Sequence, residues 1–355
     1  MDSNALIPLH YALDTFYLLI CGALVMWMAA GFAMLESGLV RSKNTTEILT
    51  KNVILYGVAC VMYLLVGYHI MYSSPEGGIL PSLGFLIGAE HAADVVAAGG
   101  DDAPAFSKRA DFFFQVVFVA TAMSIVSGAV AERMKLLAFL AFAVVMTGFI
   151  YPVQGYWKWG SGFLNQAGFL DFAGSGVVHL CGATAALAGV LMLGARRGKY
   201  ASNGQVNAIP GANLPLATLG ALILWFGWFG FNGGSQLKIS SIADANAVAS
   251  AFLNTNMAAA GGRRSAGGAG RRAPAVRQGR PDHGPQWCPG RAGGDHRRAG
   301  HPGGVDRGAD RRRGRRAGGG WRAAAGQAED RRPGGRHRGA WPGRHLGPAR
   351  RAADQ

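Results

Sequence analysis

Apolar stretches of about 20 residues recur along the first 262 residues, and they restrict the fold more than any other feature of the chain. A helix of about 20 apolar residues is long enough to cross the roughly 30 Å hydrocarbon core of a bilayer. A soluble helix would show a polar face every three to four residues, and these stretches do not. The predicted fold is therefore all-α, a polytopic bundle of membrane helices. The spans are expected at about 12–35, 52–72, 112–131, 136–153, 172–195 and 212–232, with a seventh starting near 245.

The first apolar stretch is interpreted as a retained span and not as a signal peptide. Asp2 is the only charged residue before Asp14, and no Lys or Arg precedes the stretch. The stretch is also longer than the apolar region of a signal peptide.

Basic residues in the connections predict the orientation of the chain. They follow the first, third and fifth spans, whereas the connection at 73–111 is mainly acidic. Cytoplasmic loops are enriched in Lys and Arg, so we expect the N-terminus outside, with Lys158 and Lys238 as exceptions. The residues that carry this pattern are Arg41, Lys43, Lys51, Arg133, Lys135, Arg196, Arg197 and Lys199.

The cysteines have neither metal-ligand nor disulfide spacing. Cys21, Cys60 and Cys181 lie in apolar spans and Cys288 lies in the tail. Buried small apolar side chains are the favoured interpretation, and no metal or cofactor is predicted.

The fifth span contains two polar residues of interest, because polar groups inside a span are costly. Asp171 stands at the expected helix start, where a carboxylate caps free N–H groups and complements the helix dipole. His179 lies eight residues on, roughly 12 Å deeper along the axis. Either His179 is a neutral imidazole bonded to an adjacent helix, or it lines a pore. The small neighbours Ser175, Gly176, Gly182 and Ala183 favour the pore.

Aromatic residues gather at the ends of the spans. In the sixth span, which ends WFGWFGFNGGS, Trp225 and Trp228 fit either interface anchors or a pore wall. Phe231 and Ser235 are four apart and share one helix face. Phe114 and Phe118 have the same spacing in the third span, which is more typical of a core pair than of a gate, and Trp159, just outside the fifth span, also fits an interface anchor. Aromatic rings attract cations, so an aromatic entrance above a histidine suits a small solute that can shed its charge.

Several motifs in order along residues 1–262 resemble the ammonium transporter/Rhesus protein family. They are GLVRSKN at 38–44, FQVVF followed by GAVAER in the third span, DFAGSGVVH, GWFGFNGGS, and FLNTNMAAA at 252–260. The resemblance runs from the first span to the start of the seventh. It implies a homotrimer of eleven-span subunits in the cell membrane, each subunit with its own narrow pore for nitrogen uptake.

The resemblance also implies roles for single residues. Trp159, Phe118 and Ser235 would form an external ammonium-recruiting site, supported from behind by Asp171. Phe118 and Phe231 would form a stacked gate.

Further along the implied pore, His179 would be the first of two pore histidines, and Trp228 would belong to the pore wall. The family's second pore histidine lies in a later span within a V-H-G motif, and this chain has no such span. About six to seven of the eleven spans are present.

The character of the chain changes at Arg263. Residues 1–262 carry a net charge of −1, whereas residues 263–355 carry +16, with 23 Arg and with no Lys, Ile or Phe. Three interpretations of this Arg/Gly/Ala-rich tail are open: a disordered basic arm, a patch for nucleic acid or anionic lipid, or a wrong reading frame.

The reading-frame interpretation can be tested on the residues themselves. Reading from the second base of each codon, from Gly279 through RPDHGPQWCPGRAGGDH, permits the peptide ADLTMVLNGALAGLVAIT. The segment GGRHRGAWPGRHLG permits AAIAVHGLAGIWG. Trp287 and Trp341 have a single codon, which forces Gly in both peptides. Both peptides are apolar and resemble later spans of the family, and the second contains V-H-G. We therefore expect residues 1–262 to be the N-terminal part of the membrane domain and 263–355 to be out-of-frame translation.

The predicted function is the passage of ammonium, recruited outside and conducted as ammonia through a hydrophobic pore. The chain is expected to be a channel-like transporter and not an enzyme, with no nucleic-acid partner. Missing later spans would leave polar groups unpaired in lipid, so this chain is predicted to misassemble or be degraded. The alternative is a membrane ammonium sensor whose basic cytoplasmic tail binds nucleic acid or a partner.

Overall fold

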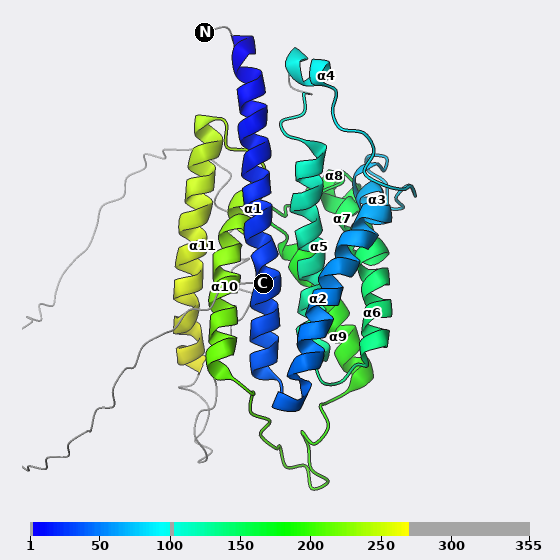
Figure 1. Cartoon of the computed structure of the whole chain (residues 1–355), viewed down its shortest axis with the longest axis vertical. Helices are drawn as coiled ribbons and strands as arrows, with labels where there is room; N and C mark the ends of the chain where they lie inside the picture. Colours follow the sequence, from blue (N-terminus) through cyan, green and yellow to red (C-terminus); the bar gives the residue numbers. More distant parts are fainter. Residues whose placement is uncertain (1–2, 100–102, 270–355) are drawn as a thin grey trace, which may run out of the picture. The chain divides into compact units, whose positions relative to one another are not determined.

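The computed structural model of the chain describes residues 3–99 and 103–269 (Figure 1). Most of the predicted tail, from residue 270 onward, lies outside the described residues. The described residues form helices together with one isolated bridge between Tyr200 and Val206. The α-helices are α1 (Ser3–Leu39), α2 (Thr45–Met62), α3 (Tyr68–Tyr72), α4 (Ala93–Ala98), α5 (Lys108–Val130), α6 (Leu136–Val145), α7 (Tyr151–Lys158), α8 (Phe163–Gln166), α9 (Cys181–Leu193), α10 (Leu214–Gly234) and α11 (Ile242–Ala269).

Six helical segments in the described part of the chain are long and apolar enough to cross a membrane. They confirm the six predicted spans, and the protein is a multi-pass membrane protein. The second and fourth segments each contain two α-helices joined by a π-helical turn, at Tyr63–Gly67 and Met146–Ile150, and the fifth begins with the π-helical turn Ser175–Leu180. The six segments are Leu6–Leu39, Ser42–Tyr72, Lys108–Val130, Leu136–Gln166, Ser175–Leu193 and Leu214–Gly234.

The predicted bounds were too short in the first, second and fourth spans. The helices continue through polar and half-buried residues at their ends, which an apolar pattern does not include. The seventh predicted span corresponds to α11, which begins at Ile242 and is less apolar than the six spans. Because α11 extends to Ala269, the change of composition at Arg263 does not coincide with a helix end.

The helix α5 is the most buried of the six spans, and α1, α2 and α9 pack around it. On the other side of α1 lies α10, so that α1 separates α5 from α11 in Figure 1. The close approach of α1 and α10 depends on small residues. A Cβ at Gly220 would lie 2.4 Å from the backbone nitrogen of Leu35, which is too close for any other residue.

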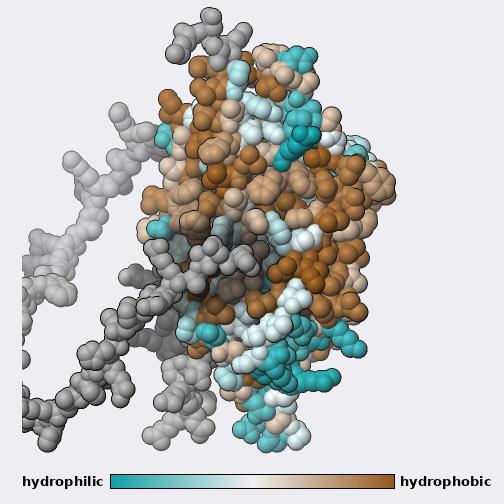
Figure 2. Space-filling model, in the orientation of Figure 1, coloured by the Kyte–Doolittle hydropathy of each residue, from teal (hydrophilic) through white to brown (hydrophobic). Residues whose placement is uncertain are grey.

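Apolar side chains cover the middle of the visible surface, and hydrophilic residues gather toward its ends (Figure 2). Large side chains such as Phe16 on α1 and Leu191 on α9 are 63% and 75% exposed. In water such exposure over so many residues would be costly. In a membrane the same side chains face lipid, as expected for spanning helices.

At the end of the bundle where α1 and α5 terminate, Glu132 joins three connections. Its carboxylate accepts hydrogen bonds from Arg41 Nε at 3.0 Å, Asn44 Nδ2 at 2.6 Å and Arg196 Nη1 at 3.2 Å. Burial raises the pKa of Glu132, but these donors, Arg41 first, outweigh it and lower the pKa to about 2. Glu132 has φ +63°, a conformation that costs a residue with a side chain roughly 1–3 kcal/mol. The three donors offset that cost and hold the connections together.

Candidate functional site

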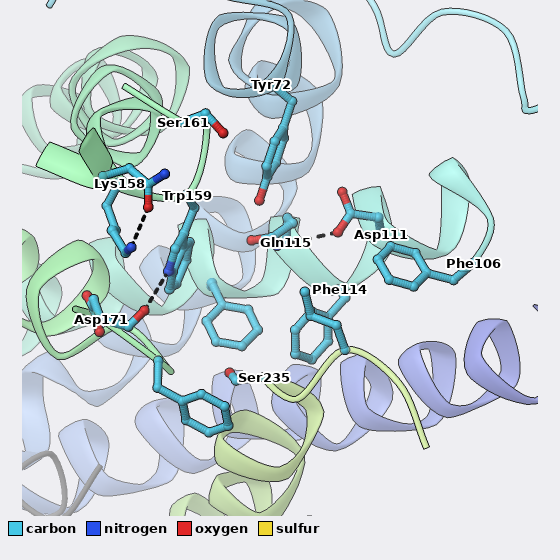
Figure 3. Close-up of a pocket in the computed structure, with 14 residues that line it drawn as sticks. Tyr72, Phe106, Asp111, Phe114, Gln115, Lys158, Trp159, Ser161, Asp171 and Ser235 are labelled. Atoms are coloured by element: carbon cyan, nitrogen blue, oxygen red, sulfur yellow. Dashed lines mark hydrogen bonds between the residues drawn. The ribbon is translucent and has the colours of Figure 1, made fainter. Parts of the chain in front are cut away.

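A cavity of about 480 Å³ opens at the other end of the bundle, between α3, α5, α7 and the segment that follows α10 (Figure 3). It contains four of the predicted site residues, Trp159, Phe118, Ser235 and Asp171. The structure therefore brings together side chains from three distant parts of the sequence. The full lining is Tyr72, Phe106, Asp111, Phe114, Gln115, Phe118, Lys158, Trp159, Ser161, Asn165, Asp171, Phe172, Ser235 and Leu237.

Aromatic rings form one wall and the floor of this cavity. The Trp159 ring meets the Phe118 ring edge-on, with 6.1 Å between the ring centroids. The ring centroid of Phe118 lies 4.3 Å from that of Phe231, and both residues are 1% exposed. The indole Nε1 of Trp159 donates to the backbone oxygen of Asp171 at 3.0 Å, which fixes the orientation of the ring. The rings thus present both a cation-attracting surface and a closed, dry layer beneath it.

His179 lies on the inner side of this closed layer. Its ring centroid is 5.4 Å from that of Phe231 and 6.0 Å from that of Trp228, with which it is nearly parallel. It belongs to the π-helical turn Ser175–Leu180, a feature often found at functional sites. Trp228 is only 6% exposed, so the interpretation of this residue as an interface anchor is wrong.

Asp171 caps the helix start, as its position predicted, but from outside the helix. Its carboxylate accepts four backbone N–H groups, from Gly174, Ser175, Gly176 and Val177, at 2.8–2.9 Å. The helix begins at Ser175 and not at Asp171, because the chain first makes a loop with Gly174 at φ +102°. That loop turns successive N–H groups toward one carboxylate.

Ser235 ends α10 at the edge of the cavity. Its Oγ donates to the carbonyl oxygen of Phe231 at 2.7 Å, which is the contact expected for residues four apart on one helix face. The hydroxyl oxygen keeps its acceptor capacity toward the cavity. The Phe231–Ser235 spacing therefore predicted a real juxtaposition.

Four cavity residues were not predicted from the sequence: Asp111, Gln115, Tyr72 and Lys158. A signal for the first two was available, since Asp111, Gln115 and Phe118 occupy positions i, i+4 and i+7 of one helix face. Asp111 was assigned to the acidic connection because the third span was predicted to start at residue 112. In the structure α5 starts one turn earlier, at Lys108.

The loop over the cavity end is anchored by Glu90. Its carboxylate accepts from Ser107 Oγ at 2.8 Å and from the backbone nitrogens of Lys108 and Arg109 at 2.8 and 3.2 Å, so it caps α5. Burial raises the pKa of Glu90, but the hydrogen bonds from backbone nitrogens, that of His91 first, outweigh it and lower the pKa to about 2.

Fold and site together define a multi-pass membrane protein with an aromatic-lined cavity, closed beneath by Phe118 and Phe231, and with a histidine on the inner side of that layer. The family model described as Ammonium Transporter Family matches residues 16–272. The chain belongs to the ammonium transporter family, a class of transport proteins and not of enzymes. The match extends ten residues beyond Gly262.

Two relatives and two solved structures illustrate the similarity. The chain is 43% identical over 265 residues to the ammonium transporter Amt2 of Archaeoglobus fulgidus, covering 70% of this chain and 52% of the relative. It is 40% identical to a putative ammonium transporter of Synechocystis, covering 74% and 57%. Among solved structures, a protein described as Sensor Amt Protein matches with a TM-score of 0.65 and 35% identity, over 75% and 64% of the chains. Mep2 of Candida albicans matches with a TM-score of 0.59 and 28% identity, over 72% and 54%. The chain thus spans about half the length of the curated relatives it matches.

Proposed function

We propose that this chain is the first part of an ammonium channel, which recruits ammonium at the aromatic cavity and conducts it as ammonia. The observation that carries the proposal is the unbroken series of rings from Trp159 through Phe118 and Phe231 to His179, with centroid separations of 4.3–6.1 Å. Relatives at 40–43% identity carry the name ammonium transporter, which supports the choice of solute.

The chemistry of this series favours a change of protonation state along the path. The face of an indole or phenyl ring attracts a cation, and the acceptor oxygen of Ser235 can receive one N–H of ammonium. Phe118 and Phe231 are each only 1% exposed, and moving an unpaired charge into such an apolar layer costs far more than moving a neutral solute. Ammonia is neutral and can still hydrogen-bond to the imidazole of His179. The proton would travel separately.

We place the cavity end outside the cell and the N-terminus with it. Support comes from the basic residues at the opposite end, which include Arg41, Arg133 and Arg196, since cytoplasmic connections collect such residues. Location in the cell membrane and assembly as a homotrimer are part of the same proposal, and nucleic acid is not part of it.

The proposal also assigns residues 1–262 to the membrane domain and residues 263–355 to out-of-frame translation. The end of the family match at residue 272, soon after the composition changes, supports this division. The nucleotide sequence around the codon of Gly262 decides the matter. A single uninterrupted frame with every codon as printed would contradict it.

A membrane sensor of ammonium is the second candidate, and the similarity to Sensor Amt Protein is the observation that favours it. That similarity covers the membrane helices, which a transporter shares, so it does not outweigh the names of the relatives. A sensor needs its tail in the cytoplasm. Protease treatment of sealed vesicles distinguishes the two, because a tail cleaved from the external side excludes cytoplasmic signalling.

The test of transport uses cells that lack their own ammonium uptake. We expect growth on low ammonium when the gene is read in the shifted frame after Gly262, and no growth with the 355-residue chain. Trp159→Ala in the frame-corrected gene should weaken growth at low ammonium more than at high ammonium, because recruitment is lost. Absence of growth from a frame-corrected protein that reaches the membrane would contradict ammonium conduction.

A further inference from the structure

Three charged side chains line the cavity that contains Trp159 and Phe118: Lys158, Asp171 and Asp111. They lie on different sides of it, with Lys158 and Asp171 near Trp159 and with Asp111 on α5 beside Gln115 (Figure 3). Which of the three can interact with an entering cation depends on the hydrogen bonds that each side chain already makes.

Two of the three are already engaged. Asp171 accepts four backbone N–H groups, which fill the acceptor positions of a carboxylate. The Lys158 ammonium donates to Asn165 Oδ1 at 2.6 Å. Neither group is therefore directed at a cation in the cavity. The carboxylate oxygens of Asp171 are bonded to the helix start, and the Lys158 ammonium is itself a cation, bonded to the amide of Asn165.

Asp111 differs from both. In the part of the chain that the structure describes, its side-chain oxygens accept from Tyr68 Oη at 2.8 Å and from Gln115 Nε2 at a long 3.4 Å. Since a carboxylate has about four acceptor positions, Asp111 keeps capacity toward the cavity that it lines. No lysine or arginine is paired with it among the described residues.

The position of Asp111 on α5 matches a role above the aromatic rings. Phe114, Gln115 and Phe118 follow it at i+3, i+4 and i+7, on the same helix face. Phe118 is the ring that meets both Trp159 and Phe231. A cation attracted by Asp111 therefore arrives over the helix face that leads to the closed layer.

We propose that Asp111, with Gln115 beside it, forms an outer subsite for small ammonium and alkylammonium cations, which raises their concentration above Phe118. This inference rests on the proposed function, since it concerns the same cavity. It adds an attracting carboxylate that is separate from Asp171, and it assigns Asp171 a purely positioning role.

The test measures equilibrium binding of radiolabelled methylammonium to the full chain in nanodiscs of phosphatidylcholine, a lipid without net charge. Asp111→Asn removes the charge but keeps an oxygen that accepts from Tyr68. We expect affinity to fall about tenfold, the size expected for one partly desolvated charge at short range. Raising the salt from about 0.01 to 0.15 M shortens the Debye length from roughly 30 to 8 Å, so it should weaken binding to the unaltered chain more than to Asp111→Asn.

Asp94→Asn is the matched control, because it removes the same charge from an exposed residue of α4 at the same end of the bundle. It should bind as the unaltered chain does. Equal affinity in Asp111→Asn and Asp94→Asn, with binding still abolished by Trp159→Ala, would overturn the subsite and leave the proposed function standing. Loss of binding in all variants and in the unaltered chain, in preparations that show a cooperative melting transition, would count against both proposals.

A second measurement does not depend on how well the isolated chain binds. In the frame-corrected protein, Asp111→Asn should raise the KM for methylammonium uptake about tenfold with little change in maximal rate, because recruitment and not conduction is altered. A fall in maximal rate at unchanged KM would indicate a structural role for Asp111 and would overturn the proposal.

Discussion

The two ends of the helix bundle both bury carboxylates, but they satisfy them with different partners. At the cavity end, Asp171 accepts four backbone N–H groups, and Asp14 accepts the backbone nitrogens of Ile239 and Ser240. At the opposite end, Glu132 is paired with two guanidinium groups, those of Arg41 and Arg196. Backbone dipoles stabilise a carboxylate without adding a positive charge, whereas arginines cancel its charge.

This difference separates two tasks. Ion pairing at the Glu132 end ties three connections into a rigid junction whose charges are balanced. Backbone capping at the cavity end fixes the loops without adding a positive charge. Under the proposed function, the cation is attracted at this end by Asp111 and the rings, because no lysine or arginine pairs with Asp111 among the described residues. The two kinds of carboxylate should therefore respond differently to substitution.

Asp171→Ala is expected to be the most damaging change. It leaves four buried N–H groups without an acceptor, and the loss of a cap together with unsatisfied donors destabilises by about 3 kcal/mol. The loop 172–174 would lose its geometry, and the backbone carbonyl of residue 171, which accepts from Trp159, would be displaced with it. We expect a lower melting temperature in detergent and loss of methylammonium binding.

Asp171→Asn separates the cap from the charge. The amide keeps one oxygen for the N–H groups, so stability should fall less than in Asp171→Ala. If Asp171→Ala melted like the unaltered chain, the backbone capping inferred for this end would be wrong.

Glu132→Gln tests the ion-paired end and is expected to destabilise by about 2 kcal/mol near neutral pH, the range for hydrogen bonds to charged groups. The pKa of Glu132 is lowered to about 2, below its ordinary value, so its stabilisation is complete above about pH 5. That stabilisation disappears as the pH falls toward 2. Melting temperatures of the two proteins should therefore differ at pH 7 and converge at low pH.

Glu47→Gln serves as the control for this experiment, since Glu47 is exposed on α2 at the same end and takes part in no ion pair among the described residues. It should melt like the unaltered protein at every pH. A constant difference between Glu132→Gln and the parent across the pH range would show that charge is not what Glu132 contributes.

The spans were predictable because apolar length is a local property of the sequence, whereas the assembly of Trp159, Phe118 and Phe231 was implied only by the family resemblance. Apolar length located the helices, and the i, i+4 relation placed Ser235 beside Phe231 correctly. The junction at Glu132 was not predictable, because its partners Arg41 and Arg196 lie 91 and 64 residues away. Only packing of separate helices brings them together.

Local spacing also failed where the helix departs from regular α geometry. The π-helical turn Ser175–Leu180 and the loop before it moved the helix start away from Asp171. Asp111 was missed for a related reason, since a charged first turn hides the true start of α5 from an apolar pattern. Polar residues at helix ends are therefore the part of the site that sequence reasoning located least well.

Glu90→Gln should have a smaller effect, about 1 kcal/mol, because Glu90 is only half-buried and solvent weakens its contribution. The amide still accepts one or two of the N–H groups at the start of α5. Limited proteolysis between residues 73 and 106 should be faster in Glu90→Gln than in the control Asp94→Asn. Equal cleavage rates would mean that Glu90 does not anchor this loop.

The smallest expected change in stability is that of Ser235→Ala. Among the described residues its hydroxyl bonds to the carbonyl of Phe231 alone, in its own helix, and such local bonds add little to helix stability. Ser250→Ala on α11 removes a bond of the same kind, to the carbonyl of Asn246, away from the cavity. Both variants should melt like the parent, within about 0.5 kcal/mol. Only Ser235→Ala should weaken methylammonium binding, by about threefold to tenfold, the size of one hydrogen bond to a charged ligand in a partly solvated site. Equal affinities in the two variants would mean that the Ser235 hydroxyl serves the helix end alone, and the cavity end would then attract cations through its carboxylate and rings without a hydroxyl acceptor.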